Sequence, residues 1–298
     1  MALLDVVGAT VKFGGITAVN DATFSVDGGS ITGLIGPNGA GKTTLFNVIT
    51  GLQPATSGRV RFKGRDVTKA TVNSRAKMGM ARTFQRLEAF GSLTVRENIQ
   101  AARDIYAGPR GWFSLARDPK IDELIETVGL HRYVDQRADS VPTGVARLLE
   151  IARALAIQPD LLLLDEPSSG LDEAETESFG ELLVHLASEG RAVLMVEHDM
   201  DLVMSVCHLI HVLEFGKVIA TGTPDEIRSN KKVQAAYLGF GDDDDMPVPD
   251  DIAAEAEAIV GHHVHHIDER PRPGALEFPG AEMQNEITMQ IPAVGGER

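Results

Sequence analysis

The sequence predicts an α/β fold in which a mostly parallel sheet is covered by helices. Two aliphatic runs, residues 161–164 and 193–196, are short enough to be buried central strands. Residues 147–156 instead repeat apolar side chains at helical spacing. A glycine-rich loop lies between a third aliphatic run, Ile31–Ile35, and a further helical stretch at 42–51. Strands that alternate with helices in this way form parallel sheets with helical layers on their faces.

In chain order, the first 35 residues alternate short apolar runs with glycine turns, which is typical of strands. A helical pattern follows over about 94–134, where Val95 and Ile99 share one face and Ile121 and Ile125 share another. The predicted strands cover residues 9–13, 22–26, 31–35, 59–63, 161–164 and 193–196. The predicted helices cover residues 42–51, parts of 94–134, and 147–156.

Composition favours a cytosolic protein with a large buried core. The chain has 298 residues, 43% of them hydrophobic, which suffices for one large domain or two smaller ones. No apolar run approaches the roughly 18–20 residues of a membrane-spanning helix, and the first residues lack the features of a secretory signal. The single cysteine, Cys207, cannot form an internal disulfide, so we expect a reducing compartment.

Charge divides the chain into two parts. The net charge is −15, and residues 241–298 hold 14 acidic residues and three arginines, a net of −11, which leaves −4 for residues 1–240. We therefore expect residues 1–240 to form the folded domain and residues 241–298 to form a disordered acidic tail. Neither part has the basic face that nucleic-acid binding requires, so we expect no nucleic-acid partner.

The loop after the run at 31–35 fits the phosphate-loop pattern G-x-x-x-x-G-K-[ST]. Glycines let a backbone turn tightly, so that its N–H groups converge on phosphate oxygens, and the start of the next helix adds a favourable dipole. Lys42 can reach the outer phosphates as a point charge, and the Thr43 hydroxyl can ligate Mg²⁺. A chance glycine turn before a lysine is less favoured, because a strand and a helix flank the loop. The loop consists of Gly36, Pro37, Asn38, Gly39, Ala40, Gly41, Lys42, Thr43 and Thr44.

A second pattern is the aliphatic run at 161–164 followed by Asp165 and Glu166. Acids at the carboxyl end of a parallel strand lie at the edge where such sheets bind ligands. We expect Asp165 to hold Mg²⁺, directly or through water, and Glu166 to polarise a water against the terminal phosphate. The alternative, a solvated acidic turn, is less favoured because a phosphate loop precedes it in the chain.

Two further residues indicate little when each is taken alone. His198 follows the run at 193–196 and could contact the terminal phosphate, although a lone histidine after a strand is more often structural. Gln85 is a neutral residue between two predicted regions. They become informative about function through their positions in the chain relative to the phosphate loop and to the acids at 165–166.

Together these motifs resemble the nucleotide-binding subunit of ATP-binding-cassette (ABC) transporters over residues 3–240. Stretches at 12–15, 81–85, 149–155 and 236–239 are most similar to ATPases of branched-chain amino-acid importers, and urea-type importers and lipopolysaccharide-export ATPases share several of them. The motifs follow in the family's order: Phe13, the phosphate loop, Gln85, a signature segment near 141–147, Asp165 with Glu166, a D-loop at 169–172, and His198.

The resemblance implies a P-loop NTPase cassette with a mostly parallel core sheet, an antiparallel β subdomain and an inserted helical subdomain at about 86–156. It implies ATP and Mg²⁺ as ligands, bound between two cassettes, identical or paralogous, that drive transmembrane permease subunits and indirectly serve a solute-binding protein. Such a subunit would lie peripherally on the cytoplasmic face of the membrane. Leu87, Ala89 and Phe90 would contact a permease helix, unless they simply pack against the core.

The resemblance also implies a role for each site residue. Phe13 would stack on adenine, which is typically worth about 1–3 kcal/mol for a base on an aromatic ring. Thr43, Gln85 and Asp165 would surround Mg²⁺. The catalytic residues would be Glu166 as the base, with Lys42 and His198 on the terminal phosphate. The nucleotide would be held by the phosphate loop, with Thr44 on the inner phosphates, and by Thr143 and Gly144 of the signature segment from the other cassette.

The signature segment departs from the family pattern, because residues 141–145 read VPTGV where LSGGQ is usual. Gly144 keeps its backbone N–H, the helix that follows still points its N-terminus at the expected phosphate, and Thr143 could supply a hydroxyl. Either this half-site is slower, or a paralogous cassette supplies a standard signature to the other half-site. A binding module without turnover is disfavoured by the presence of Glu166 and His198.

Two other interpretations are weaker. A soluble ABC ATPase of DNA repair or translation usually carries two cassettes or a coiled-coil insertion, and this chain shows neither. The tail also contains four histidines that could bind Zn²⁺ or Ni²⁺, but we expect its acidic residues mainly to keep it solvated. These are His262, His263, His265 and His266.

Overall fold

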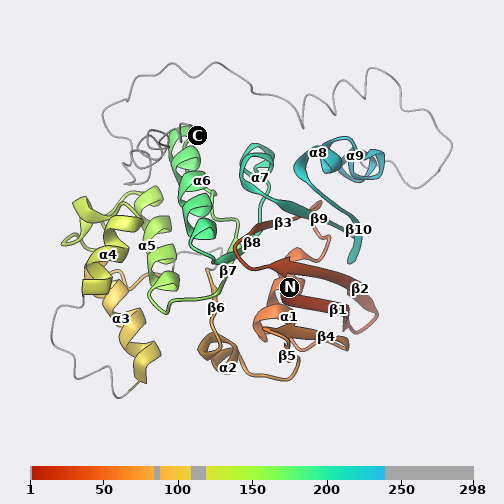
Figure 1. Ribbon diagram of the computed structural model, residues 1–298, viewed down its shortest axis with the longest axis horizontal. Coiled ribbons are helices and arrows are strands. Elements are labelled where there is room, and N and C mark those ends of the chain that lie inside the picture. The colour runs from red at the N-terminus through yellow and green to blue at the C-terminus, as the bar shows by residue number, and fades with distance from the viewer. Residues whose placement is uncertain (1, 84–87, 109–118, 239–298) are drawn as a thin grey trace, which may run out of the picture.

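The computed structural model describes residues 2–83, 88–108 and 119–238, which form two sheets and their covering helices (Figure 1). The strands are β1 (Ala2–Phe13), β2 (Ile16–Asp27), β3 (Ile31–Ile35), β4 (Ser57–Phe62), β5 (Arg65–Asp66), β6 (Met80–Arg82), β7 (Leu161–Asp165), β8 (Ala192–Val196), β9 (Leu209–Glu214) and β10 (Lys217–Gly222). The helices are α1 (Lys42–Thr50), α2 (Val72–Lys77), α3 (Val95–Ala107), α4 (Pro119–Thr127), η2 (His131–Tyr133), α5 (Thr143–Leu155), α6 (Glu173–Ser188), α7 (Met200–Val206), α8 (Pro224–Arg228) and α9 (Lys231–Leu238).

The core sheet has six strands in the order β10-β9-β3-β8-β7-β6. All neighbouring strands are parallel except the pair β9–β10, which is antiparallel. The predicted α/β class with a mostly parallel sheet is therefore confirmed. All five residues of β3, β7 and β8 are buried, as expected for central strands with helices on both faces.

A second, antiparallel sheet has the order β2-β1-β4-β5. Strands β1 and β2 are longer than the predicted 9–13 and 22–26. The predicted strands were too short because Gly8 and Asp21 interrupt the alternation of apolar and polar residues that marks a strand in a sequence. Both residues have positive φ angles, 61° and 58°, and the pairing of β1 with β2 shifts register between Val6 and Ala9. These bulges bend the hairpin without ending it.

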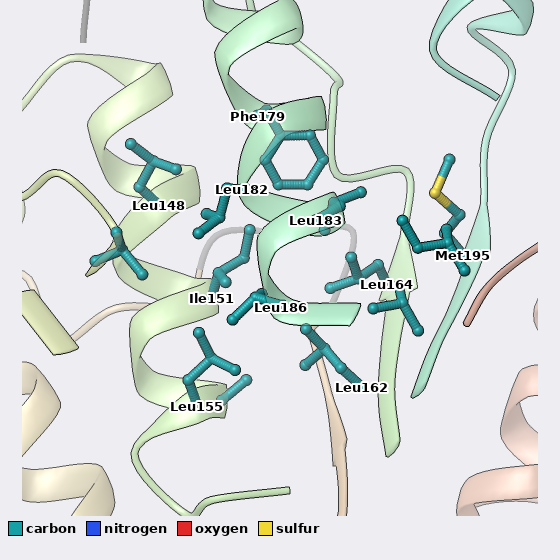
Figure 2. Packing of buried hydrophobic residues seen from close by; sticks show 14 of the residues in the cluster. Leu148, Ile151, Leu155, Leu162, Leu164, Phe179, Leu182, Leu183, Leu186 and Met195 are labelled. Carbon is teal, nitrogen blue, oxygen red and sulfur yellow. The ribbon is translucent and has the colours of Figure 1, made fainter. Parts of the chain in front are cut away.

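The two faces of the core sheet bury different helices, because successive side chains of a strand point to opposite faces. On β7, Leu161 and Leu163 share a cluster with α1 and the antiparallel sheet, so α1 lies between the two sheets. On its other face, Leu162 and Leu164 pack with α5, α6 and α7. Figure 2 shows α6 between α5 and the sheet. Full burial of a leucine or phenylalanine contributes about 1.5–3 kcal/mol, so this layer stabilises the position of α5.

The helices α3, α4 and α5 lie together at one end of the molecule (Figure 1). Helix α3 begins at a capping box, in which the Thr94 hydroxyl accepts from the N–H of Glu97 and the Glu97 carboxylate accepts from the N–H of Thr94. Helix α5 begins at Thr143, four residues before the predicted start at 147. The helix begins earlier because Pro142 occupies the N-cap and its fixed φ suits a helix start.

Strands β9 and β10 were not predicted, and the proposed tail at 241–298 lies outside the described residues. Among the residues that the structure describes, no helix is both long enough and apolar enough to span a membrane.

Candidate functional site

The phosphate loop joins β3 to α1 and has the predicted tight turns. Gly36, Gly39 and Gly41 have φ angles of 148°, 82° and 104°. At Gly36 an added Cβ would collide with the carbonyl of Leu213, and at Gly41 with that of Ala18. The loop is therefore packed directly against the backbone of its neighbours, and α1 begins at Lys42 with its N-terminus at the loop.

Lys42 is only 7% exposed, and its ammonium donates to the carbonyls of Gly36 (2.5 Å) and Pro37 (3.1 Å). Burial lowers the pKa of Lys42 from its ordinary value, while the negative charges of Glu166 and Asp165 oppose this shift. The lysine is thus close enough to both acids to interact with their charges. Thr43 at the helix start is exposed and Thr44 is partly exposed, so both hydroxyls are accessible to a ligand.

Asp165 ends β7 and is buried, as predicted for an acid at the carboxyl edge of the sheet. Its Oδ2 accepts from the guanidinium of Arg82 at 2.7 Å. The carboxylate oxygen of Asp165 and the hydroxyl of Thr43 are the hard oxygen ligands that Mg²⁺ prefers, and Mg²⁺ sites commonly combine one or two carboxylates with substrate phosphates. The residues present therefore fit a magnesium ion.

Glu166 follows with a backbone that is unusual for its residue type. Its φ of 50° lies in the left-handed region, and its N–H donates to the carbonyl of Val196 at 2.9 Å. This bond ties the end of β7 to the end of β8. As a result, Oε1 of Glu166 lies 3.0 Å from Nε2 of His198. Residues held in such conformations cluster at functional sites.

Sequence reasoning missed Glu197, which holds the histidine segment in place. Its buried carboxylate accepts from the N–H of Ser168 (2.8 Å) and from the N–H of His198 (3.0 Å). Glu197 therefore links the segment after β7 to the segment after β8. The available signal was an acid directly after a buried strand, in the same position relative to β8 that Glu166 has relative to β7.

The structure places the remaining predicted site residues around this centre with different outcomes. Phe13 ends β1 with 49% of its surface exposed, on the hairpin whose second strand contacts the loop through Ala18 and Gly41. Gln85 lies outside the described residues, and so does Leu87. The other loop positions, Pro37, Asn38 and Ala40, occupy the predicted turn between β3 and α1.

The signature residues Thr143 and Gly144 begin α5, which lies away from α1 (Figure 1). Gly144 packs against the carboxylate of Glu175 on α6, so closely that a Cβ there would collide with it. The Thr143 methyl lies beside Gly170 of the D-loop segment. The structure therefore brings Lys42, Asp165, Glu166 and His198 together within one chain, whereas Thr143 and Gly144 stand apart on another element.

The comparisons with known proteins agree with this arrangement. Residues 19–169 match the family model described as ABC transporter, and residues 217–239 match the one described as branched-chain amino acid ATP-binding cassette transporter. The chain is similar to the high-affinity branched-chain amino acid transport ATP-binding protein LivG of Salmonella typhimurium, with 38% identity over 249 residues, covering 80% of this chain and 98% of LivG.

It is also similar to the lipopolysaccharide export system ATP-binding protein LptB of Haemophilus influenzae, with 35% identity across 74% of this chain and 90% of LptB. Among solved structures, an ATP-binding cassette of an ABC transporter in its ADP conformation aligns with a TM-score of 0.73 at 30% identity. The alignment covers 80% of this chain and 99% of that one.

Proposed function

This chain belongs to the ABC transporter ATP-binding family and is the ATPase subunit of such a system; from this premise we propose that it hydrolyses Mg²⁺-bound ATP at the phosphate loop to drive import of branched-chain amino acids. The observation that carries the proposed site is the convergence of Lys42, Asp165, Glu166 and His198 at the carboxyl ends of β7 and β8 and the start of α1.

Each of these groups has a definite role in phosphoryl transfer. The amides of the loop and the ammonium of Lys42 hold the outer phosphates, and Thr44 helps to hold the inner ones. Thr43 and Asp165, together with Gln85, hold Mg²⁺, which neutralises charge that develops on the phosphates. Glu166 accepts the proton of the attacking water, and His198, at 3.0 Å, orients that carboxylate and contacts the terminal phosphate.

The wider assembly follows from the same proposal. Residues 1–240 form the cassette, with the helical subdomain at about 86–156, and two cassettes close on two nucleotides. Phe13 stacks on adenine, while Thr143 and Gly144 of the partner cassette reach the phosphate, which is consistent with their position apart from the loop of their own chain. Permease subunits dock on the helical subdomain at the cytoplasmic face of the membrane, and a solute-binding protein supplies the amino acid.

The importer assignment is favoured over lipopolysaccharide export by the match of residues 217–239 to the branched-chain model and by the higher identity to LivG than to LptB. With the complete transporter in vesicles, ATP turnover should rise when a binding protein loaded with leucine, isoleucine or valine is added. If ATP turnover does not rise with any of these three amino acids, the proposed substrate class is rejected.

Glu166→Gln tests the catalytic assignment. The amide keeps the size of the side chain but cannot accept the proton of water, so ATP turnover should fall at least ~10²-fold, while ATP binding measured by calorimetry persists. Glu173→Gln, on an exposed acid of the first turn of α6, is the matched control and should leave turnover unchanged. Unchanged turnover in Glu166→Gln would reject Glu166 as the base.

A further inference from the structure

Arg82 makes two contacts that neither the sequence motifs nor the proposed mechanism assigns. It is the last residue of β6, at the edge of the core sheet, and its side chain is only 7% exposed. Its guanidinium donates through one nitrogen to Oδ1 of Asn47 at 2.6 Å and through another to Oδ2 of Asp165 at 2.7 Å. The same group lies over the ring of Phe46, 5.6 Å from its centroid.

The two acceptors lie on different elements, one on a helix and the other at the end of a strand of the core sheet. Asn47 is on α1, four residues after Thr43, so the two side chains lie on the same face of that helix. Asp165 ends β7, which is separated from β3, the strand leading to α1, by β8. The distance between Thr43 and Asp165, the proposed metal ligands, is therefore set by contacts between the helix and the sheet.

We propose that Arg82 is a positioning residue that fixes the spacing between Thr43 and Asp165 for a divalent cation. The inference rests on the proposed function, since it takes these two residues as ligands. By engaging Oδ2, Arg82 fixes the orientation of the Asp165 carboxylate, and by engaging Asn47 it ties that carboxylate to the helix face that carries Thr43. Groups that orient metal ligands in this way commonly change metal affinity 10–100-fold when they are removed.

Arginine suits this position for a chemical reason. Its planar fork presents two donors in fixed directions, which match two acceptors on different elements. A lysine carries all its donors on one nitrogen at the end of a flexible stem, so it does not reproduce the two separate nitrogens that reach Asp165 and Asn47 here. The ring of Phe46 covers one side of the guanidinium and restricts its movement.

The opposite role has a distinct signature. If Arg82 merely competed with the cation for Asp165, a variant with a weaker contact to Oδ2 would bind the cation more tightly, because the carboxylate would be released for it. Asn47→Ala separates the two roles, since it changes no charge and removes only the tie to α1. Under competition it should have no effect, whereas under positioning it should act in the same direction as an Arg82 variant.

The test compares Arg82→Lys and Asn47→Ala with the parent protein by calorimetric titration with ADP, in EDTA and in Mg²⁺. Both variants should need about tenfold more Mg²⁺ to reach half of the Mg²⁺-dependent gain in ADP affinity, with little change in the affinity in EDTA. Arg96→Lys is the matched control, because Arg96 makes a partly exposed 2.7 Å ion pair with Asp122 between α3 and α4, and it should change neither quantity.

A lower or unchanged Mg²⁺ requirement in both variants would overturn the proposal. A loss of ADP affinity that is as large in EDTA as in Mg²⁺ would also overturn it, because it would indicate a damaged phosphate loop. Thermal unfolding identifies a variant that fails to fold, and if Arg82→Lys fails, Asn47→Ala decides alone. Failure of the proposed function is distinguishable, because it appears as normal turnover in Glu166→Gln, whereas this test measures binding only.

Discussion

At the level of single residues, the phosphate loop depends on the absence of side chains at Gly36 and Gly41. Both residues have positive φ angles, and at both an added Cβ would collide with a backbone carbonyl, of Leu213 and Ala18 respectively. Backbone carbonyls cannot rotate away as flexible side chains can. The loop is thus held between β9 and β2 as well as by its own turns.

Gly41→Ala and Gly39→Ala form a pair that separates strain from collision. Both positions have positive φ, but within the part of the chain that the structure describes no atom lies within 4 Å of an added Cβ at Gly39. Gly39→Ala should cost about 1–2 kcal/mol of stability from the left-handed backbone alone. Gly41→Ala should cost about 1–3 kcal/mol more, because the carbonyl of Ala18 must move. Urea unfolding measures both, and equal losses would contradict the packing argument.

Residues that bind through a recognisable motif could be predicted from sequence, whereas residues that act on other residues could not. Lys42, Asp165 and Glu166 stand at positions set by the phosphate-loop pattern and the strand before the acids. The contacts of Arg82 and Glu197 join segments far apart in the chain, so no local spacing indicates them. An acid directly after a buried strand was the only signal for Glu197, and Arg82 ends β6, a strand that was not predicted.

At the level of elements, α5 is tied to the segment that follows position 87. Glu150 accepts from the N–H of Glu88 at 2.9 Å, and Arg153 donates to the carbonyl of Glu88 at 2.5 Å. The guanidinium of Arg153 also lies 5.1 Å from the ring centroid of Phe90. Since Phe90 is 43% exposed, it is accessible to a partner, while its backbone neighbours are fixed to the helix that carries the signature residues.

Arg153→Ala should loosen this connection. The variant loses a charged hydrogen bond and the contact with Phe90, so stability should fall by about 1.5–3 kcal/mol. If Phe90 meets the permease as proposed, turnover of the complete transporter should lose more than turnover of the isolated cassette. Arg137→Ala, which removes an exposed ion pair with Asp139 outside α5, is the control. An equal loss of turnover in the complete transporter and in the isolated cassette would contradict a functional connection between α5 and the permease.

The elements were predicted best where the apolar pattern is clear, either along one face of a helix or as a continuous buried run. Helix α3 matches the helical pattern around Val95 and Ile99, and β7 and β8 match aliphatic runs. The start of α5 was placed too late, although Val145 in its first turn continues the apolar face of Leu148 and Leu149 and Pro142 occupies the N-cap. Strands β9 and β10 were missed because partly polar sequences such as those around His211 do not show the alternation of a strand.

At the level of the whole molecule, His211 joins the two sheets. It lies on β9 and its Nε2 is 3.1 Å from the carbonyl of Ser25 on β2, so Nε2 carries the proton in the neutral ring. Nδ1 then accepts from the hydroxyl of Thr221 on β10 at 2.9 Å. Burial lowers the pKa of His211 from its ordinary value, despite the opposing effect of the Ser25 carbonyl. The folded protein therefore favours the neutral ring.

This preference predicts how stability depends on pH. Because the folded pKa of His211 is depressed, its contribution to stability is complete above the unfolded value of about 6.5 and is lost as the pH falls towards the folded value. Between pH 7.5 and 5.5 the parent should therefore lose more unfolding free energy than His211→Gln, which cannot titrate. Urea unfolding at the two pH values measures the difference, and an equal loss in both proteins would contradict the neutral assignment.

The overall class was predictable because the period of the apolar pattern changes from strand to helix many times along residues 1–240. The arrangement of two sheets around α1 was expected only through the family resemblance, since no local pattern states which sheet a strand joins. The acidic tail, by contrast, stays a prediction from composition alone.

The isolation of Cys207 has a practical consequence for spectroscopy. It is the only cysteine of the chain, it is buried, and burial, reinforced by the charge of Glu197, raises its pKa to about 12. A thiol that stays protonated at neutral pH reacts poorly with maleimide dyes and nitroxide labels. An engineered surface cysteine could therefore carry a fluorophore or spin probe without first removing the natural one, and dipolar or energy-transfer ruler measurements between two labelled copies could start from the otherwise unaltered protein.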